Sequence, residues 1–456
     1  MSAVAPASTF ATEARANLKL ALPLIAAQLA GVGMGAIDAV MAGHLGAREL
    51  AAVAVAVNLN VVLFVFCMGP FMACSAIVSQ RRGAGGDDAA LGCFARSTLL
   101  LALVMGALWC GLTQVLAAPL LNSLHLDALT TTLAIDYLRA FVCSSFGLSL
   151  WFALRFVAEG LEQSRPVMVA GLVGLLANAL FNWLLIYGIG PFPRLGLPGS
   201  GWATTLACLA MAATLASYYR LHPRLRGVQL FASRETEPGA VREVLRLGFP
   251  IGLILIAEAG LFVAVAVMMA RIGERTVAAY QVAINFASIA FMIPLGIGLA
   301  TTVRVGFFAG AKQPLLARQA GITGMKLGLA NAALNAAVML IFASLIVALY
   351  TQDAGIAAQA IGFLSLAAAF QFFDGLQATA NGALRGLKDT RVPMLITLVS
   401  YWLIGLPVCW WLAFYTPLVA DGLWWGLCAG LAAAAAGLSW RFLHRTARYL
   451  PPRDSI

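Results

Sequence analysis

The sequence predicts an all-α membrane protein whose twelve transmembrane helices form two six-helix lobes, related by a pseudo-two-fold axis along the membrane normal. Three observations lead to this fold class: the apolar composition, the placement of the basic residues and an internal repeat. Of the 456 residues, 61% are hydrophobic and 11% are charged, whereas a soluble domain carries about 25% charged residues. One soluble core cannot enclose so much apolar surface, so lipid must be the solvent for much of the chain.

Twelve apolar runs are long enough to cross a bilayer, which takes about 20 residues of α-helix. Helices are the expected element because a spanning segment must satisfy its own backbone hydrogen bonds in lipid. The first run is not preceded by the cationic start of a cleaved signal peptide, so we expect it to remain as a helix. The predicted spans are 17–42, 50–79, 95–118, 132–157, 166–189, 199–220, 242–270, 277–307, 318–349, 355–383, 392–415 and 421–443.

The basic residues predict an orientation for these spans. If the N-terminus is cytoplasmic, 24 of the 29 lysines and arginines lie in cytoplasmic segments or at cytoplasmic helix ends. The five on the outer side are Arg48, Arg139, Arg194, Arg271 and Arg275. Cytoplasmic loops are enriched in lysine and arginine, so the bias supports twelve spans with both termini cytoplasmic. Arg304, at the inner end of the eighth span, is expected to snorkel toward the headgroups.

The second half of the chain repeats the first. A shift of 227 residues places Pro23 on Pro250 and the stretch 50–58 on 277–285, without a gap. Chance similarity between apolar helices does not match proline, asparagine and glycine at one offset. Six spans in each half insert in the same direction, so the halves should be parallel repeats. Such repeats are an architecture of transporters, with the substrate site between the halves.

A polar and charged segment at 222–241 separates the two repeats. It contains two prolines and several arginines and glutamates. We expect a cytoplasmic linker here, joining an N-lobe at 1–221 to a C-lobe at 242–456. Its composition suits a tether that lets the two lobes rock.

Three acidic residues lie inside predicted spans, where an ionisable group costs at least ~2.5 kcal/mol at the helix centre. Glu258 and Asp374 lie near the middle of the seventh and tenth spans, and Asp38 lies toward the outer side of the first. No basic residue within a helical turn explains them as ion pairs. Such an acid must face a cavity, bind a cation or be protonated, which suits exchange between H⁺ or Na⁺ and a cationic substrate. A protonated acid that hydrogen-bonds a neighbouring helix is the simpler alternative.

Weaker candidates accompany the acids. Asn178 lies one turn from Asn182 on the fifth span, where interhelical hydrogen bonding is the simpler interpretation. Phe370 and Phe373 on the tenth span and Tyr280 on the eighth are candidate substrate contacts. Rings beside carboxylates suit flat cationic compounds through stacking and cation–π contact. For any single ring, packing in the core or against lipid is the simpler interpretation.

Several function classes lack their motifs. The chain has no P-loop, no G-x-S-x-G and no G-x-G-x-x-G after a strand, so neither an enzyme nor an ATP-driven pump is expected. The eight cysteines form no C-x-x-C pair and the four histidines no H-E-x-x-H, so no metal site is expected beyond Na⁺ at Glu258 and Asp374. The net charge of +10 is spread over short loops, which indicates topology and not nucleic-acid binding.

Three segments resemble signatures of the multidrug and toxic compound extrusion (MATE) transporters, in their NorM-type branch. They are residues 20–46, which include Asp38 in Gly-Ala-Ile-Asp-Ala-Val-Met-Ala-Gly, and residues 302–306 and 381–386. The resemblance runs from about residue 13 to 445. It implies a twelve-helix, two-lobe antiporter of the bacterial inner membrane that uses no cofactor. Such a protein would export cationic drugs by alternating access in exchange for Na⁺ or H⁺ as the coupling ion.

The resemblance also implies residue roles. Glu258 and Asp374 would bind the coupling ion, and Asp38 with Asn178 would bind a proton or the substrate. Some members carry a tyrosine near the tenth-span acid, where this chain has Phe370. The missing hydroxyl leaves the choice between Na⁺ and H⁺ open. We expect a monomer whose partners are small cationic or aromatic substrates and membrane lipids.

A lipid or lipid-linked oligosaccharide flippase of the same superfamily is the nearest alternative. Its cavity should be rich in arginine and lysine to bind a pyrophosphate, whereas the interior of these spans is acidic. An integral-membrane transferase would need paired acidic or histidine motifs at the membrane–loop boundaries, and the sequence has none. The antiporter is therefore the preferred interpretation.

Overall fold

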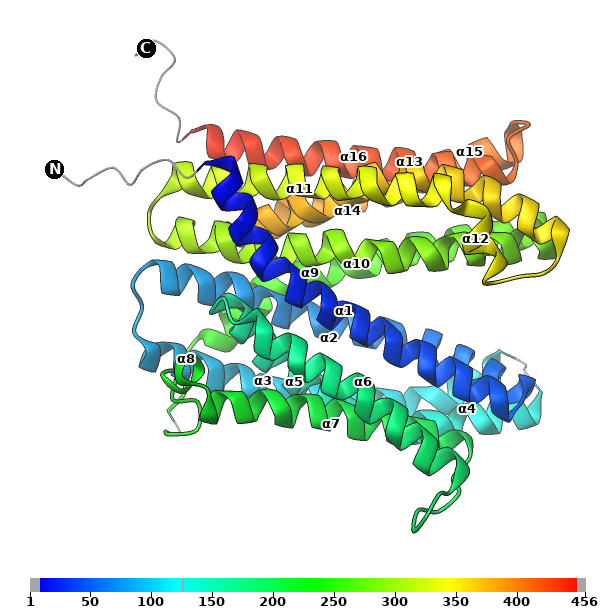
Figure 1. The fold of residues 1–456 in the computed structure, drawn as a ribbon, viewed down its shortest axis with the longest axis horizontal. Coiled ribbons are helices and arrows are strands. Elements are labelled where there is room, and N and C mark those ends of the chain that lie inside the picture. Colours follow the sequence, from blue (N-terminus) through cyan, green and yellow to red (C-terminus); the bar gives the residue numbers. More distant parts are fainter. Residues whose placement is uncertain (1–8, 125–126, 234, 449–456) are drawn as a thin grey trace. The chain divides into compact units, whose positions relative to one another are not determined.

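A computed structural model describes residues 9–124, 127–233 and 235–448, and these residues form helices joined by turns and loops, without a β-strand. Figure 1 shows long helices that run side by side within each part of the molecule. The predicted all-α fold class is confirmed. Arg234 and Arg453, which the sequence places on the cytoplasmic side, lie outside the described residues.

Each predicted span lies on one of these helices or on a run of consecutive ones. The helices are α1 (Phe10–Leu45), α2 (Ala47–Gly83), α3 (Asp88–Ser123), α4 (Ala128–Phe141), α5 (Ser144–Gly160), α6 (Ser164–Tyr187), α7 (Leu197–Leu221), α8 (Pro223–Arg226), α9 (Ala240–Ile272), α10 (Glu274–Gly310), α11 (Pro314–Ile341), α12 (Ala343–Ala348), α13 (Ala354–Gly386), α14 (Arg391–Leu398), the π-helical turn η1 (Val399–Gly405), α15 (Leu406–Tyr415) and α16 (Ala420–Ala447).

The helices are long and apolar enough for a multi-pass membrane protein. Within the described residues, 11 helices pass as membrane spans by length and composition, and the bent pair of α4 and α5 raises the number to 12. Many large apolar side chains on these helices are exposed, as expected where lipid and not water is the solvent. The prediction of twelve spans is confirmed to this extent.

The fourth span differs from its prediction because a bend of 44° separates α4 from α5. The helix expected over 132–157 is interrupted at residues 142–143. The Ser145 hydroxyl donates to the carbonyl of Gly106 in α3 at 3.0 Å, and a Cβ at Gly106 would lie only 3.2 Å from the Cα of Phe146. The bend therefore packs where α3 has no side chain in the way.

Two further spans depart from a continuous α-helix. The ninth, expected over 318–349, ends in α11 at Ile341 and is followed by the short helix α12. The eleventh has its predicted extent, 392–415, to within a residue but contains η1 between α14 and α15. A Cβ at Gly405, the last residue of η1, would lie 3.1 Å from the Cα of Gly430 in α16. A π-helical turn places an extra residue in a helix and often lies at a functional site.

Two compact units divide the chain by packing, and we name them by the half of the sequence that each mainly contains. The N-unit consists of Ala26–Val78 and Gly85–Gly252, and the C-unit of Met1–Ile25, Ser79–Ala84 and Leu253–Ile456. The helices α1 and α9 each contribute to both units. They change units after Ile25 and after Gly252, which are positions related by the 227-residue repeat. The expected lobes, joined at 222–241, remain a prediction about the repeat.

The sequence repeat is matched by a repeat in helix packing. Within the N-unit, a Cβ added at Gly69 of α2 would collide with the backbone of Gly252 in α9. Within the C-unit, a Cβ added at Gly296 of α10 would collide with Ile25 of α1. Gly296 and Gly252 are the repeat equivalents of Gly69 and Ile25. The same close helix crossing is therefore built once in each unit.

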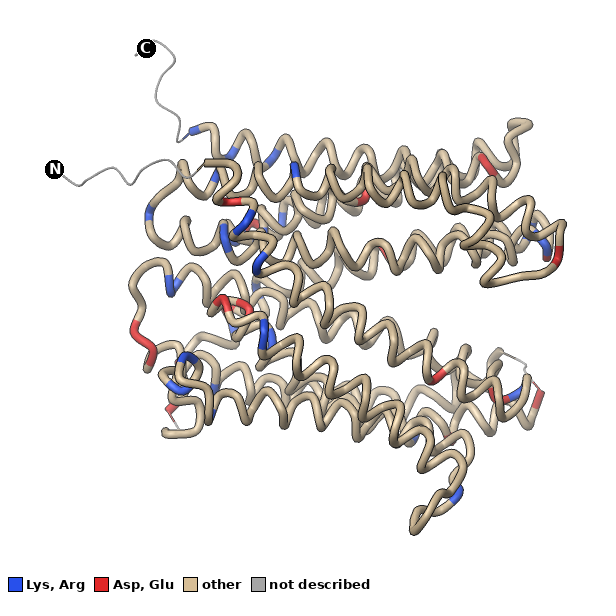
Figure 2. The backbone as a smooth tube through the Cα atoms, in the orientation of Figure 1, with Lys and Arg blue, Asp and Glu red and all other residues tan. Residues whose placement is uncertain are grey.

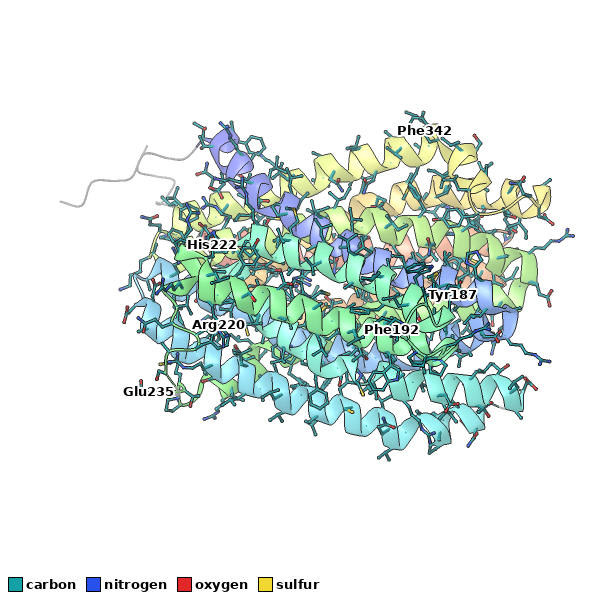
Figure 3. All side chains as sticks on the ribbon, turned by 60° about the horizontal axis from the view of Figure 1, so that its bottom comes forward. Tyr187, Phe192, Arg220, His222, Glu235 and Phe342 are labelled. Carbon is teal, nitrogen blue, oxygen red and sulfur yellow. The ribbon has the colours of Figure 1, made fainter. Side chains whose placement is uncertain are left out.

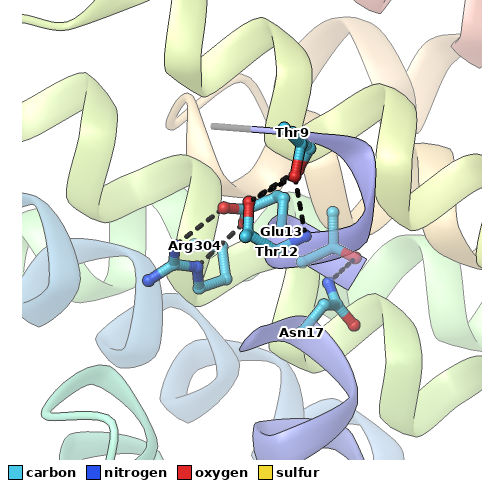
Figure 4. Close-up of polar contacts among 6 residues, drawn as sticks. Thr9, Thr12, Glu13, Asn17 and Arg304 are labelled. Carbon is cyan, nitrogen blue, oxygen red and sulfur yellow. Dashed lines mark hydrogen bonds and ion pairs between the residues drawn. The ribbon is translucent and has the colours of Figure 1, made fainter. Parts of the chain in front are cut away.

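The beginning of α1 is held to α10 within the C-unit by polar contacts (Figure 4). The Arg304 guanidinium donates from Nε to Oε1 of Glu13 at 2.9 Å and from Nη2 to Oε2 at 2.8 Å. The Asn17 amide donates to the Thr301 hydroxyl at 3.0 Å. The prediction that Arg304 snorkels is wrong, because its side chain is 17% exposed and makes a two-point ion pair. The partner, Glu13, lies too far away in sequence for the prediction to find it.

The described residues of the segment 222–241 contact α3. Arg96 of α3 donates from Nη1 to the carbonyl of Gln229 at 2.9 Å and from Nε to the carbonyl of Glu235 at 2.5 Å. Three apolar side chains of the segment are buried: Leu225, Val228 and Leu230. These contacts hold the segment to α3 within the N-unit, and its role as a linker that lets the two lobes rock remains a prediction.

Charged residues gather toward the helix ends, and few acidic positions lie along the helices (Figure 2). Within the N-unit, Figure 3 places Arg220, His222 and Glu235 at one end and Tyr187 and Phe192 toward the other. One end of the N-unit therefore carries the charged segment 222–241, as the distribution of basic residues predicts. That this end faces the cytoplasm remains a prediction.

Candidate functional site

Two of the three intramembrane acids lie together in the C-unit. Glu258 of α9 and Asp374 of α13 line one cavity of about 40 Å³. Asp374 is 3% exposed, and Glu258 is partly buried. The other residues that line the cavity are Phe262, Ile284, Ala287, Ser288, Phe291 and Phe370. The structure thus brings together two acids that are more than a hundred residues apart in the sequence.

The cavity wall is acidic and otherwise apolar apart from one serine. The charge of Glu258 acts on Asp374, and Oδ1 of Asp374 has no hydrogen-bond partner in the described part of the chain. Burial and mutual repulsion both oppose a state in which the two carboxyls are ionised. A proton or a small cation between them would remove that cost. A cavity of this size accommodates a water molecule or an ion, whereas drug-sized ligands occupy about 300–1,000 Å³.

The three aromatic candidates differ in their relation to this cavity. Phe370 lines it and packs edge-on against Phe262 and Trp424, with ring centroids 5.9 and 6.2 Å apart. Tyr280 packs against Trp424 at 5.6 Å and donates its hydroxyl to the carbonyl of Phe262 at 3.4 Å. Phe373 is partly buried against the same core. Tyr280 and Phe373 are not among the residues that line the cavity, so they are core residues in this conformation.

The third acid, Asp38, lies in the N-unit within a network of hydrogen-bond donors from α6 and α7. Its Oδ1 accepts from Asn178 at 3.0 Å, from Asn182 at 2.7 Å and from Ser200 at 3.4 Å. Its Oδ2 accepts from Thr204 at 2.8 Å. Asp38 is 7% exposed, and the side chains of its partners are also buried. The four donors favour the ionised form of the carboxyl, whereas its burial opposes that form.

Part of this network can be recognised in the sequence. Asn178 and Asn182 were recognisable because they lie one turn apart on the same helix face. Ser200 and Thr204 on α7 have the same spacing of four residues. This second pair was missed because small hydroxyl residues are common in membrane helices, where they hydrogen-bond to their own backbone. Two polar pairs of equal spacing on consecutive helices are a signal that could have found them.

Polar atoms without a partner surround the Asp38 network. Tyr137 of α4 is fully buried, its hydroxyl has no hydrogen-bond partner among the described residues, and Asp38 is the charged group that acts on it. The side-chain oxygens of Asn178 and Asn182 are likewise unpartnered there. Buried polar groups in this state usually bind water or a ligand. The network therefore has the capacity to accept a proton or a polar group.

A buried ion pair lies elsewhere in the N-unit. Arg155 of α5 donates from Nε to Oε1 of Glu159 and from Nη2 to Oε1 of Gln28 in α1, both at 2.6 Å. Its guanidinium also lies over the ring of Phe156, 5.2 Å from the centroid. Sequence analysis counted Arg155 only as a basic residue of the cytoplasmic side. The structure shows instead a side chain that is 7% exposed and neutralised by a residue one turn away.

Comparison with known sequences identifies relatives over nearly the whole chain. A family profile described as MatE matches residues 23–184 and 250–411, which are the two halves of the repeat. The multidrug resistance protein PmpM of Pseudomonas aeruginosa is 38% identical over 449 residues, covering 97% of this chain and 94% of that protein. A probable multidrug resistance protein NorM of Xanthomonas campestris pv. campestris is 38% identical over 441 residues, covering 96% of each.

Comparison with solved structures gives the same fold. The outward-facing structure of a multidrug resistance MATE family transporter of the MOP superfamily superposes with a TM-score of 0.87, over 96% of each chain. The two sequences are 20% identical, so the similarity concerns the fold alone. The relatives carry the names of multidrug resistance proteins and transporters, and not of enzymes.

Proposed function

Since this chain belongs to the MatE family of transporters, we propose that it is a secondary active multidrug efflux antiporter. It exports small cationic or aromatic compounds in exchange for Na⁺ or H⁺ by alternating access. The observation that carries the proposal is the pair of carboxyls, Glu258 and Asp374, on the wall of one small cavity in the C-unit. The names of the relatives support multidrug substrates.

Glu258 and Asp374 bind the coupling ion. Two carboxyls in an apolar cavity repel one another, and a proton or Na⁺ between them relieves the repulsion. A carboxylate is an acceptable ligand for a hard cation and an acceptable base for a proton. When the ion leaves, the repulsion between the carboxyls returns, and the binding of another positive charge relieves it again. The site therefore exchanges one bound positive charge for another. The cavity of about 40 Å³ fits the ion and not the drug.

Asp38, with Asn178, binds a proton or the substrate in the N-unit. All four of its neighbours donate to the carboxylate. A protonated Asp38 would become a donor itself on one oxygen. At least one of the present donors would then have to move. Protonation of Asp38 therefore changes its hydrogen bonds to α6 and α7, which is a suitable origin for a conformational change.

The substrate contacts have to lie outside the acidic cavity as it stands. Phe370 forms its wall, and Phe373 and Tyr280 lie in the core nearby. An opening of this core would expose rings next to two carboxyls, and that combination binds flat organic cations. We keep these three aromatic residues as proposed substrate contacts for such an open state.

The protein acts in the bacterial inner membrane as a monomer surrounded by lipid, with both termini in the cytoplasm. The basic residues gathered at the helix ends support this orientation. A lipid flippase is the less favoured function. Its anionic headgroup calls for a basic cavity, whereas the carboxyls of Glu258 and Asp374 make this one acidic.

Transport into everted membrane vesicles tests the proposal. Uptake of ethidium or norfloxacin is measured under a Na⁺ gradient and, separately, under a pH gradient. The wild type should accumulate the drug under at least one gradient. Glu258→Gln and Asp374→Asn should each lower the gradient-driven rate by about tenfold or more, because each removes a charge that the ion must neutralise.

Asp136→Asn serves as the matched control. Asp136 is an exposed acid that pairs with Arg139 at 3.6 Å, and exposed pairs of this kind contribute little. Its amide variant should transport at the wild-type rate. Normal transport by both cavity variants would refute the coupling site. If neither gradient drives the transport of any tested cation, the antiporter proposal is refuted.

A further inference from the structure

The C-unit buries a tyrosine hydroxyl that has no hydrogen-bond partner. Tyr401 is completely buried, and its hydroxyl donates to and accepts from no group among residues 9–124, 127–233 and 235–448. Burying a hydroxyl without a hydrogen-bond partner destabilises the folded protein. Two other buried tyrosines avoid this cost: Tyr219 donates to the carbonyl of Leu154 at 2.9 Å and Tyr280 to that of Phe262 at 3.4 Å. The position of Tyr401 therefore requires an explanation other than packing.

Tyr401 lies in the π-helical turn η1, which is fixed on two sides. On one side, Gly405 of η1 lies against Gly430 of α16. On the other, Trp402 packs over Gly260 of α9, where a Cβ would lie 2.9 Å from Cζ2 of the indole. Gly260 is two residues beyond Glu258. The turn therefore packs against α9 next to the acidic cavity, and its extra residue changes the direction of the side chains that it carries.

The electrostatic surroundings of the hydroxyl are acidic. The charged groups that act on Tyr401 are Glu258 and Asp374. Within the part of the chain that the structure describes, one oxygen of Asp374 has no hydrogen-bond partner either. Tyr401 also belongs to the same hydrophobic core as Phe370, which lines the cavity. The Tyr401 hydroxyl and Oδ1 of Asp374 thus lack partners in the same acidic environment, and both are suited to binding a shared ligand.

From this arrangement we propose that Tyr401 supplies a third oxygen to the coupling-ion site of Glu258 and Asp374. The inference rests on the proposed role of these two acids and adds a neutral ligand to them. A phenol oxygen coordinates a small cation through its lone pairs. The sequence has Phe370 where a hydroxyl was expected, and Tyr401 provides one from a different helix.

The role of Tyr401 also matches the organisation of the N-unit. The fifth span, α6, presents Asn178 and Asn182 to the buried acid of the N-unit. The corresponding fifth span of the second half is the run of α14, η1 and α15, which carries Tyr401. In both halves, therefore, the same span of the repeat supplies neutral polar groups to an acid on another helix. In the C-unit the π-helical turn presents the polar group to the acids, whereas in the N-unit the spacing of two asparagines does so.

Tyr401→Phe tests the proposal, because it removes the hydroxyl oxygen and keeps the ring. The concentration of coupling ion that gives half-maximal drug transport should rise by about tenfold, the effect expected for losing one contact to a charged group. The ion is Na⁺ at fixed pH, or H⁺ at fixed Na⁺, depending on which gradient drives the wild type. The maximal rate at saturating ion should remain within about twofold of the wild type.

Tyr219→Phe is the matched control, since it removes a buried hydroxyl that has a structural partner. Its ion dependence should not change. The melting temperature without the coupling ion verifies that both variants fold, and the rise in melting temperature on adding the ion reports binding directly. The rise on adding the ion should be smaller in Tyr401→Phe than in the wild type, and it should be unchanged in Tyr219→Phe.

The outcomes separate this inference from the proposed function. Normal coupling in Glu258→Gln and Asp374→Asn would overturn the coupling site itself. Defective acid variants together with an unchanged ion dependence in Tyr401→Phe would overturn only the role of Tyr401. A lower ion-free melting temperature without any change in ion dependence would show a structural tyrosine and would also overturn it.

Discussion

At the scale of single residues, each unit contains an acid that is buried in a different polar setting. Asp38 is surrounded by four donors, all from two neighbouring helices. Asp374 shares a small cavity with Glu258, and one of its oxygens has no hydrogen-bond partner among the described residues. The first arrangement stabilises a carboxylate by hydrogen bonds, whereas the second stabilises it only when a positive charge is present. The two sites should therefore respond differently to substitution.

Thr204→Val should have a smaller effect than Asp38→Asn. The valine has the shape of threonine and removes one donor to Oδ2 of Asp38, which should change the ion dependence of transport by about tenfold or less. The asparagine removes the charge and places donors opposite the donors of Asn178 and Asn182, so it should abolish most export. Drug accumulation in intact cells, measured at equal amounts of membrane-inserted protein, checks the order. Equal transport by both variants would contradict it.

The buried ion pair of Arg155 and Glu159 should contribute to the stability of the folded protein and not to the coupling of ion binding to transport. Arg155→Met would leave the Glu159 carboxyl buried with one fewer partner, a loss that typically costs about 3–5 kcal/mol. The double variant with Glu159→Gln should recover a large part of this loss, because no charge is left unpaired. Melting temperatures of the purified protein measure both effects. A double variant less stable than Arg155→Met would show that the pair acts in another way.

At the scale of helices, close crossings occur where glycine replaces a side chain. Within the C-unit, a Cβ at Gly310 of α10 would collide with the backbone of Gln80 in α2, and one at Gly83 with the backbone of Phe307. These two contacts are repeat equivalents with the partners exchanged. Small residues allow membrane helices to approach closely and gain dispersion energy without a hydrophobic driving force. The fold therefore depends on glycines that hydropathy alone does not distinguish.

Gly310→Ala should destabilise the protein although alanine is the better helix former. The added methyl group has backbone on the opposite side, and overpacking of this kind typically costs about 1–3 kcal/mol. Gly111→Ala on α3 is the control, because a Cβ there meets nothing within 4 Å. It should be neutral or slightly stabilising. The melting temperatures of the two variants should thus move apart, and a common shift would contradict the packing argument.

At the scale of the whole molecule, the repeated sequence builds repeated helices but not repeated chemistry. The repeat position of Glu258 is Gly31, and Asp38 lies seven residues further along α1. Each unit thus has its own acidic site, and the separation of seven residues places Asp38 about two helical turns away from the position that corresponds to Glu258, at a different depth of the equivalent helix. Gene duplication preserves the apolar pattern because every helix must still cross lipid. The ionisable positions are free to differ, since only function maintains them.

The proposed orientation can be measured with two single cysteines in a variant without the eight natural ones. Phe192→Cys lies in the loop after α6, and Glu235→Cys lies in the segment after α7. Figure 3 shows these positions toward opposite ends of the N-unit. A membrane-impermeant maleimide added to intact cells should label position 192 and not position 235. Labelling of position 235 alone would reverse the topology predicted from the basic residues.

The sequence by itself determined the membrane-spanning segments and their number. Lipid allows only one way of satisfying the backbone of a spanning segment, so apolar length translates directly into helix. The sequence also identified Glu258, Asp374 and Asp38, because a charge inside an apolar run is costly enough to be conspicuous. Its predictions were weakest where a helix is interrupted, as at residues 142–143, since a bend depends on the space left by a neighbour.

Only the tertiary structure decided which groups meet. It joined Glu258 to Asp374, brought Ser200 and Thr204 to Asp38, and paired Arg304 with Glu13. It also placed an unpartnered Tyr401 in the environment of the two acids. The physical reason is that burial is a property of one helix in lipid, whereas a hydrogen bond or an ion site requires atoms from helices that are distant in the chain. The charged residues could therefore be recognised from the sequence, whereas their partners could be identified only from the fold.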